Sequence, residues 1–130
     1  MSDVIHGKCL CGKVTFDVGS AGALGTCHCT RCTRWTGQGA TVVVAPASGF
    51  KITGGKELVK KYHEEKFADR YFCSNCGSGI YADGGETYYV SAGVLKDVAL
   101  MPAFHCQVAY KAPWDEIGGS APQFAEYPPH

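Results

Sequence analysis

Apolar and polar residues alternate over several short stretches of this chain. In residues 13–18 every second side chain is apolar, which is typical of a strand with one buried face. Residues 40–45 form a continuous apolar run with three valines, which predicts a strand buried on both faces. Four more stretches rich in Tyr, Val and Ile predict strands at 58–63, 70–73, 79–82 and 88–94.

Helical signals are scarce. Residues 29–35 predict one helix of one or two turns, with Thr30 as its N-cap and Gly37 at its end. The pairs Gly54-Gly55 and Gly84-Gly85 predict turns, and the Gly-, Pro- and Ala-rich end of the chain predicts an extended surface arm. We therefore expect a mainly β fold with little helix.

Composition narrows the class of protein. The chain has 130 residues, of which 45% are hydrophobic and 18% charged, so we expect one globular domain over residues 1–130. Twelve basic and twelve acidic residues balance, and no basic run favours nucleic acid as a partner. Neither a signal-peptide stretch nor a membrane-spanning run is present in the sequence, which predicts no membrane partner and a cytoplasmic location. Clustered cysteines in that reducing compartment more often bind metal than form disulfides.

Seven of the eight cysteines fall into three tight groups, and two of these groups end in Cys-Gly. They are Cys9-Leu10-Cys11-Gly12 and Cys73-Ser74-Asn75-Cys76-Gly77. Glycine accepts the positive φ of a sharp turn, so each segment can direct two sulfurs at one ion. Cys9, Cys11, Cys73 and Cys76 thus predict a closed, structural zinc site with four sulfur ligands. The alternatives are reduced core cysteines or a redox-active Cys-x-x-Cys.

The middle group, Cys27, Cys29 and Cys32, lacks the glycine and offers three sulfurs within six residues. Three protein ligands and an open fourth position are typical of catalytic zinc, so we expect a second, exchangeable zinc ion here. The helix N-terminus, together with Arg31 and Arg34, would favour thiolates. A metal-free thiol cluster, a ligand role for His28 and closure of the site by His105 or Cys106 remain alternatives.

Three thiolates make zinc a weaker Lewis acid than three histidines would, which disfavours activation of water. Such an ion is suited to accept a soft fourth ligand, a substrate thiol, and to lower that thiol's pKa from its usual value of about 8.5. This chemistry favours addition of a thiol to a small aldehyde over hydrolysis.

These motifs together resemble the glutathione-dependent formaldehyde-activating enzymes. The resemblance rests on Gly-Lys-Cys-Leu-Cys-Gly-Lys-Val at 7–14, Cys-His-Cys-Thr-Arg-Cys at 27–32, Phe-Cys-Ser-Asn-Cys-Gly-Ser at 72–78 and the closing segment 105–114. It implies a mainly β fold around a four-cysteine zinc, shared with a zinc-binding chaperone of small GTPases. It also implies the same division of cysteines between a structural and a catalytic zinc.

The activity implied by the resemblance is that of a carbon–sulfur lyase that joins glutathione and formaldehyde to S-(hydroxymethyl)glutathione. No residue can be identified from the sequence as a glutathione-binding residue. Arg31, Arg34, Lys111 and His105 are candidates for its carboxylates, with solvated surface charge as the alternative, and the oligomeric state stays open.

Cys106 departs from the family pattern. The rival functions are a non-catalytic binding module for a glutathione adduct or protein partner, and a lyase acting on another thiol adduct.

Overall fold

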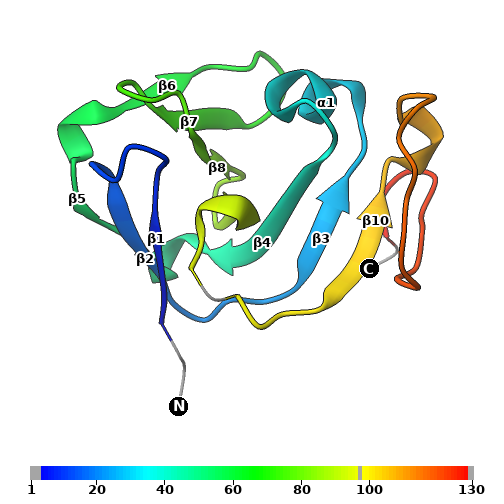
Figure 1. Cartoon of the computed structure of the whole chain (residues 1–130), viewed down its shortest axis with the longest axis horizontal. Helices are drawn as coiled ribbons and strands as arrows, with labels where there is room; N and C mark the ends of the chain where they lie inside the picture. The colour runs from blue at the N-terminus through cyan, green and yellow to red at the C-terminus, as the bar shows by residue number, and fades with distance from the viewer. Residues whose placement is uncertain (1–3, 97, 129–130) are drawn as a thin grey trace.

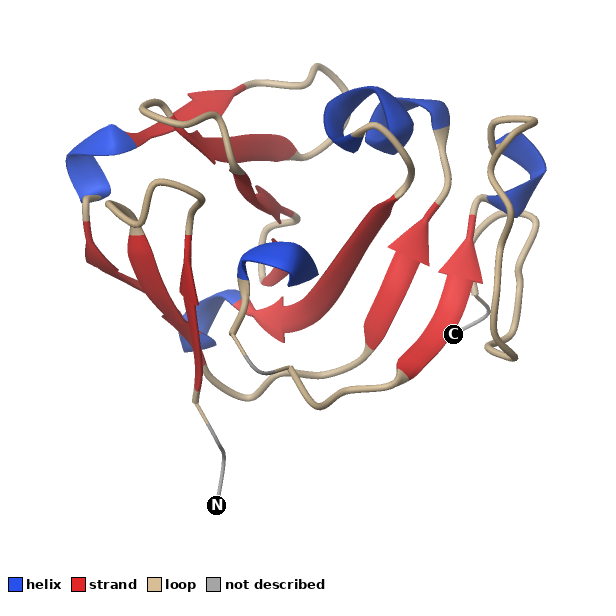
Figure 2. Cartoon of the chain, viewed as in Figure 1, coloured by secondary structure: helices blue, strands red, loops and turns tan. Residues whose placement is uncertain are grey.

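Two β-sheets make up most of the protein (Figures 1 and 2). The computed structural model describes residues 4–96 and 98–128. The smaller sheet is antiparallel, in the order β1-β2-β5, and contains β1 (Ile5–Lys8), β2 (Thr15–Val18) and β5 (Phe50–Gly54).

The larger sheet has seven strands in the order β10-β3-β4-β9-β8-β7-β6. They are β3 (Leu24–Cys27), β4 (Ala40–Pro46), β6 (Val59–Tyr62), β7 (Asp69–Cys73), β8 (Gly79–Asp83), β9 (Thr87–Ser91) and β10 (Pro102–Cys106). Neighbouring strands are antiparallel except β10 and β3, which are parallel. The mainly β prediction is confirmed.

Helical structure is limited to short pieces. One α-helix, α1 (Thr30–Thr36), lies between the end of β3 and the start of β4, near β7 (Figure 1). The others are 3₁₀ turns: η1 (Ala47–Gly49), η2 (Lys56–Leu58), η3 (Ala92–Val94) and η4 (Val108–Tyr110). No helix among the described residues has the length and apolar character needed to cross a membrane.

Four details differ from the sequence prediction. The strand expected at 88–94 ends at Ser91, and Ala92–Val94 form a 3₁₀ turn. The N-cap of α1 is Cys29, not Thr30, because its sulfur accepts the backbone N–H of Cys32. The strand at 40–45 is fully buried on one face only, since Val42 and Val44 are half-buried. Strands β1, β3, β5 and β10 were not predicted: β1, β3 and β10 carry weak alternation, and β5 alternates over two apolar positions only, Phe50 and Ile52.

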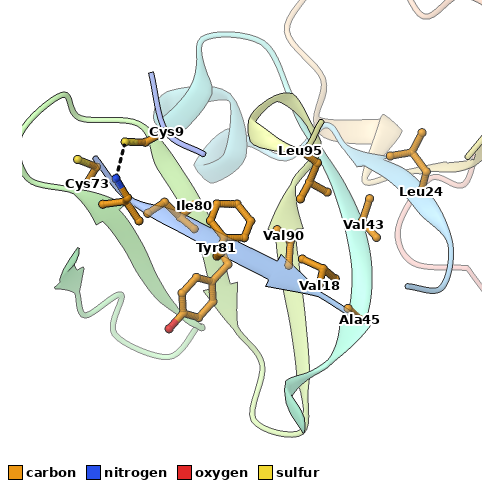
Figure 3. Close-up of a cluster of buried hydrophobic side chains, with 12 residues drawn as sticks. Cys9, Val18, Leu24, Val43, Ala45, Cys73, Ile80, Tyr81, Val90 and Leu95 are labelled. Atoms are coloured by element: carbon orange, nitrogen blue, oxygen red, sulfur yellow. Dashed lines mark hydrogen bonds between the residues drawn. The ribbon is translucent and has the colours of Figure 1, made fainter. Parts of the chain in front are cut away.

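The core lies between the two sheets. Phe16 and Val18 of β2 are fully buried, as are Val43, Ile80 and Val90 of the larger sheet. Figure 3 shows Val18 of the smaller sheet beside Val43 and Val90 of the larger sheet, within one buried cluster. Each such side chain contributes about 1.5–3 kcal/mol of burial free energy, so the sheets are held together by the hydrophobic effect before any metal is considered.

The segment after Trp114 runs beside β10 (Figure 1). The backbone of His105 bonds to this arm twice: its N–H donates to Pro122 at 2.8 Å, and its carbonyl accepts from Phe124 at 2.8 Å. The arm thereby covers the outer edge of β10.

Candidate metal centres

Four cysteine sulfurs meet where the two sheets approach each other. Cys9 and Cys11 come from the β1–β2 turn, and Cys73 and Cys76 from the β7–β8 turn; all four sulfurs lie within 4.8 Å of one another. Cys9 and Cys11 are 3.5 Å apart, and Cys11 and Cys73 are 3.9 Å apart. Sulfurs around a tetrahedral zinc with Zn–S bonds of about 2.3 Å would be roughly 3.8 Å apart, so this donor set fits zinc.

Glycine makes both turns possible. Gly12 and Gly77 have φ values of 78° and 82°, a backbone conformation that other residues rarely adopt. Their N–H groups donate to the carbonyls of Cys9 at 3.0 Å and Cys73 at 2.7 Å, which closes each turn. Both turns therefore have the positive-φ glycine that the sequence predicts.

Neutral hydrogen-bond donors surround the four sulfurs. The hydroxyl of Ser78 lies 3.2 Å from the Cys76 sulfur and helps lower the pKa of that thiol to about 5. The N–H of Val14 donates to the Cys9 sulfur at 3.4 Å, the contact drawn as a dashed line in Figure 3. Burial raises the pKa of Cys73 to about 11, so a bound cation is what would keep that sulfur deprotonated.

A second group of sulfurs lies at the N-terminus of α1. Cys27 ends β3, Cys29 caps the helix and Cys32 lies in its first turn; their sulfurs are within 4.8 Å of one another. The N–H of Cys32 donates to the Cys29 sulfur at 3.3 Å. Among the described residues this group contains no fourth ligand, and its three soft donors fit a thiophilic ion such as zinc.

The three thiols share negative charge unequally. Hydrogen bonds from Cys27 and Cys32 lower the pKa of Cys29 to about 2. Contact with Cys106, and then with Cys29, raises the pKa of Cys27, and contacts with Cys27 and Cys29 raise the pKa of Cys32. Without a metal, one thiolate therefore suppresses ionisation of its two neighbours. A divalent cation removes that conflict, which is the electrostatic reason why this cluster suits a metal.

Charged side chains border the three-cysteine group. The guanidinium of Arg70, on β7, donates to the Cys32 sulfur at 3.9 Å and to Glu64 at 2.9 Å. Arg31 lies 3.5 Å from the other oxygen of Glu64 and 3.7 Å above the ring of Phe67. Nothing in the sequence connects Glu64 with the site. For Arg70, the one indication is its position three residues before Cys73.

Cys106 lies beside the group but outside it. It pairs with Cys27 in the parallel register of β10 and β3, is 6% exposed, and hydrogen-bonds to Cys27. It does not share the mutual 4.8 Å spacing of the other three sulfurs. Closure of the site by Cys106 is thus not the arrangement seen.

His28 and His105 form a separate buried network. Nδ1 of His28 bonds to Asp115 at 2.6 Å, and its Nε2 bonds to Nδ1 of His105 at 2.9 Å. His28 is 4% exposed and Asp115 2% exposed. Both ring nitrogens of His28 are engaged, so neither is available as a metal ligand. Asp115 carried no signal in the sequence.

The other predicted binding residues have different surroundings. Lys111 donates to the carbonyl of Asp115 at 2.9 Å, Arg31 is engaged by Glu64 and Phe67, and Arg34 is exposed on α1. A groove of about 630 Å³ lies between β1, β2 and the 93–96 segment. It borders Cys9 and Ser78 but none of the three cysteines at α1, so it is not continuous with that group.

Comparison with known proteins decides the family. The model of the glutathione-dependent formaldehyde-activating enzyme family matches residues 4–110. The chain belongs to this family. An uncharacterized lyase of Schizosaccharomyces pombe is 30% identical over 102 residues, which cover 72% of this chain and 69% of that protein.

The family's fold is also represented among solved structures. A Rhodobacter sphaeroides protein of known crystal structure superimposes with a TM-score of 0.64 over 91% of this chain and 98% of the other, at 24% identity. That likeness shows the fold alone. The expected similarity to the zinc-binding chaperone of small GTPases stays a prediction.

Proposed function

We propose that this protein is a zinc-dependent carbon–sulfur lyase that adds a thiol, glutathione first among candidates, reversibly to formaldehyde or a related small aldehyde. Family membership and the lyase name of the yeast relative support the reaction class. The observation that carries the proposal is the three-sulfur group of Cys27, Cys29 and Cys32, which has no fourth ligand among the described residues.

We further propose that Cys9, Cys11, Cys73 and Cys76 hold a structural zinc, and Cys27, Cys29 and Cys32 a catalytic one. A zinc ion held by three cysteines would accept a substrate thiol as its fourth ligand and lower that thiol's pKa. The overall reaction forms one S–C bond, moves the thiol proton to the aldehyde oxygen, and needs no oxidant or reductant.

The chain's own groups prepare the site for this reaction. The Cys32 N–H holds the Cys29 sulfur, and Arg70 holds the Cys32 sulfur, so the donor geometry exists before substrate binds. Arg31 and Arg70 surround the single carboxylate of Glu64, which leaves excess positive charge beside the sulfurs. That charge favours an anionic thiol such as glutathione.

The activity can be tested by exchange NMR at equilibrium, because glutathione and formaldehyde also combine without an enzyme. Zinc-loaded protein should accelerate interconversion of free glutathione and its hydroxymethyl adduct. Cys29→Ser should return the rate to the uncatalysed level because it removes one of three ligands. Lys60→Gln, an exposed position on β6, is the matched control and should retain full acceleration.

Two outcomes would contradict the proposal. Wild-type protein that holds zinc yet leaves the exchange rate uncatalysed for glutathione and other thiols would exclude the lyase function. Saturable binding of the adduct without turnover, undiminished in Cys29→Ser, would instead support the non-catalytic binding module.

A further inference from the structure

The two cysteine groups differ in the charge of their hydrogen-bond donors. Around the four-cysteine group, the donors seen are neutral: the Ser78 hydroxyl and the backbone N–H of Val14. At the three-cysteine group one donor is charged: the guanidinium of Arg70 donates from Nη2 to the Cys32 sulfur at 3.9 Å. A charged donor withdraws more electron density from sulfur than a neutral one does.

Three elements hold Arg70 in this position. Its backbone belongs to β7, where it pairs with Ala82 of β8 and Tyr62 of β6. Its Nε donates to Glu64, and its guanidinium lies 4.6 Å from the ring of Trp35 on α1. With a side chain only 11% exposed, Arg70 has little freedom to leave the sulfur.

The charges explain what this contact would do. Three thiolates around a divalent ion carry a net charge of −1, and a fourth thiolate would bring it to −2. Glu64 cannot neutralise both Arg31 and Arg70, so about one positive charge remains next to Cys32. In a partly buried site this charge offsets the cost of adding an anionic ligand.

We propose that Arg70 is a positioning residue that fixes the Cys32 sulfur and neutralises part of its charge, so that the three-cysteine site accepts an anionic thiol as fourth ligand. The inference rests on the proposed metal site. Arg70 lies outside the cysteine motifs, and its contact with Cys32 distinguishes the exchangeable site from the closed one.

The test uses ¹¹³Cd NMR, because cadmium is thiophilic and its chemical shift reports its own ligands. Cadmium-loaded wild-type protein should give two resonances, one for each cysteine group. Arg70→Gln should shift the resonance of the three-cysteine site and leave the other unchanged, an internal control. Titration of the shifted resonance with glutathione should show binding weakened by about 10- to 100-fold, the scale on which loss of a hydrogen-bond partner of a metal ligand lowers metal affinity or activity.

Three further variants separate the explanations. Arg70→Lys keeps the positive charge but lacks the planar guanidinium. Its glutathione affinity should therefore lie between those of Arg70→Gln and the wild-type protein. Lys60→Gln removes an exposed cation from β6, the strand next to Arg70, and should leave both resonances and the affinity unchanged. If Arg70→Gln does not fold, Glu64→Gln should still shift the same resonance, since a neutral amide oxygen accepts from Nε of Arg70 more weakly than the carboxylate does.

The outcomes are distinguishable. A single wild-type resonance, from the four-cysteine group alone, would remove the proposed second metal site and this inference with it. Two resonances that Arg70→Gln and Glu64→Gln both leave in place, with unchanged glutathione binding, would overturn the role of Arg70 and leave the metal site standing.

Discussion

At the scale of single residues, burial decides which polar groups are structural. His28 was a candidate ligand because it lies between two cysteines, yet its ring is held by Asp115 and His105. Asp115 accepts from Nδ1 of His28, and Nε2 of the same ring pairs with Nδ1 of His105. This network fixes the backbone between Cys27 and Cys29, so it orders the sulfurs without touching a metal.

The His105 network should make stability depend on pH. Burial and the neighbouring His28 ring lower the pKa of His105 below 6.5. Between the folded-state pKa and about pH 6.5, the unfolded chain binds a proton at His105 more readily than the folded protein does. This contribution to the free energy of unfolding is therefore complete above about pH 6.5 and is lost as the pH falls toward the folded-state pKa. NMR titration of the ring protons of zinc-loaded protein should give a pKa below 6.5, and His105→Gln should flatten this part of the stability profile. A pKa at or above 6.5 would contradict the account.

At the scale of elements, the packing of α1 on β8 determines where the three cysteines lie. The ring of Trp35 covers Gly79, where a Cβ atom would lie 2.7 Å from the ring carbon Cζ2. The same ring lies against Arg70. Helix, strand and guanidinium thus form one packed unit beside Cys32.

Gly79→Ala should destabilise the protein by about 1–3 kcal/mol, because the added methyl group displaces Trp35 from its packed position. Chemical denaturation monitored by tryptophan fluorescence would measure this change. Gly93→Ala is the control, since its Cβ would meet nothing within 4 Å and its backbone is not left-handed. Equal stability of the two variants would show that α1 does not depend on this contact.

At the scale of the whole molecule, the four-cysteine group connects the two sheets. Cys9 and Cys11 belong to the turn of the smaller sheet, Cys73 and Cys76 to a turn of the larger one. Metal binding at such structural sites is worth about 10–16 kcal/mol in zinc-finger peptides, which is comparable to the total stability of a domain. The metal would hold together sheets that the core alone holds less firmly.

Removing one ligand from each group should therefore have unequal effects. Cys76→Ser should lower the melting temperature by more than about 10 °C, because it opens the link between sheets. Cys29→Ser should cost less, since the three-cysteine group joins β3 only to the adjacent helix. Metal analysis and thermal melts of both variants would measure this, and equal losses of melting temperature would refute the assignment of a structural role.

The mainly β class, six strand regions and the short helix could be predicted from sequence, because alternation and turn glycines act over a few residues. Gly12 and Gly77 are local in the same sense: positive φ is a property of one residue and its neighbours. The short edge strands β1 and β10 could not be predicted, since their positions depend on partners far along the chain.

The sequence by itself determined the pairs Cys9/Cys11 and Cys73/Cys76 and the group of three at 27–32, because cysteines two or three positions apart converge through local backbone geometry. The tertiary structure brings the two pairs together, since Cys11 and Cys73 are 62 positions apart. Only the tertiary structure decided what surrounds them. Arg70 reaches Cys32 across 38 positions, and Asp115 reaches His28 across 87. Such contacts depend on sheet order and side-chain packing, which residue spacing does not predict. The sulfur donors could therefore be predicted from the sequence, and the charged and polar groups around them could not.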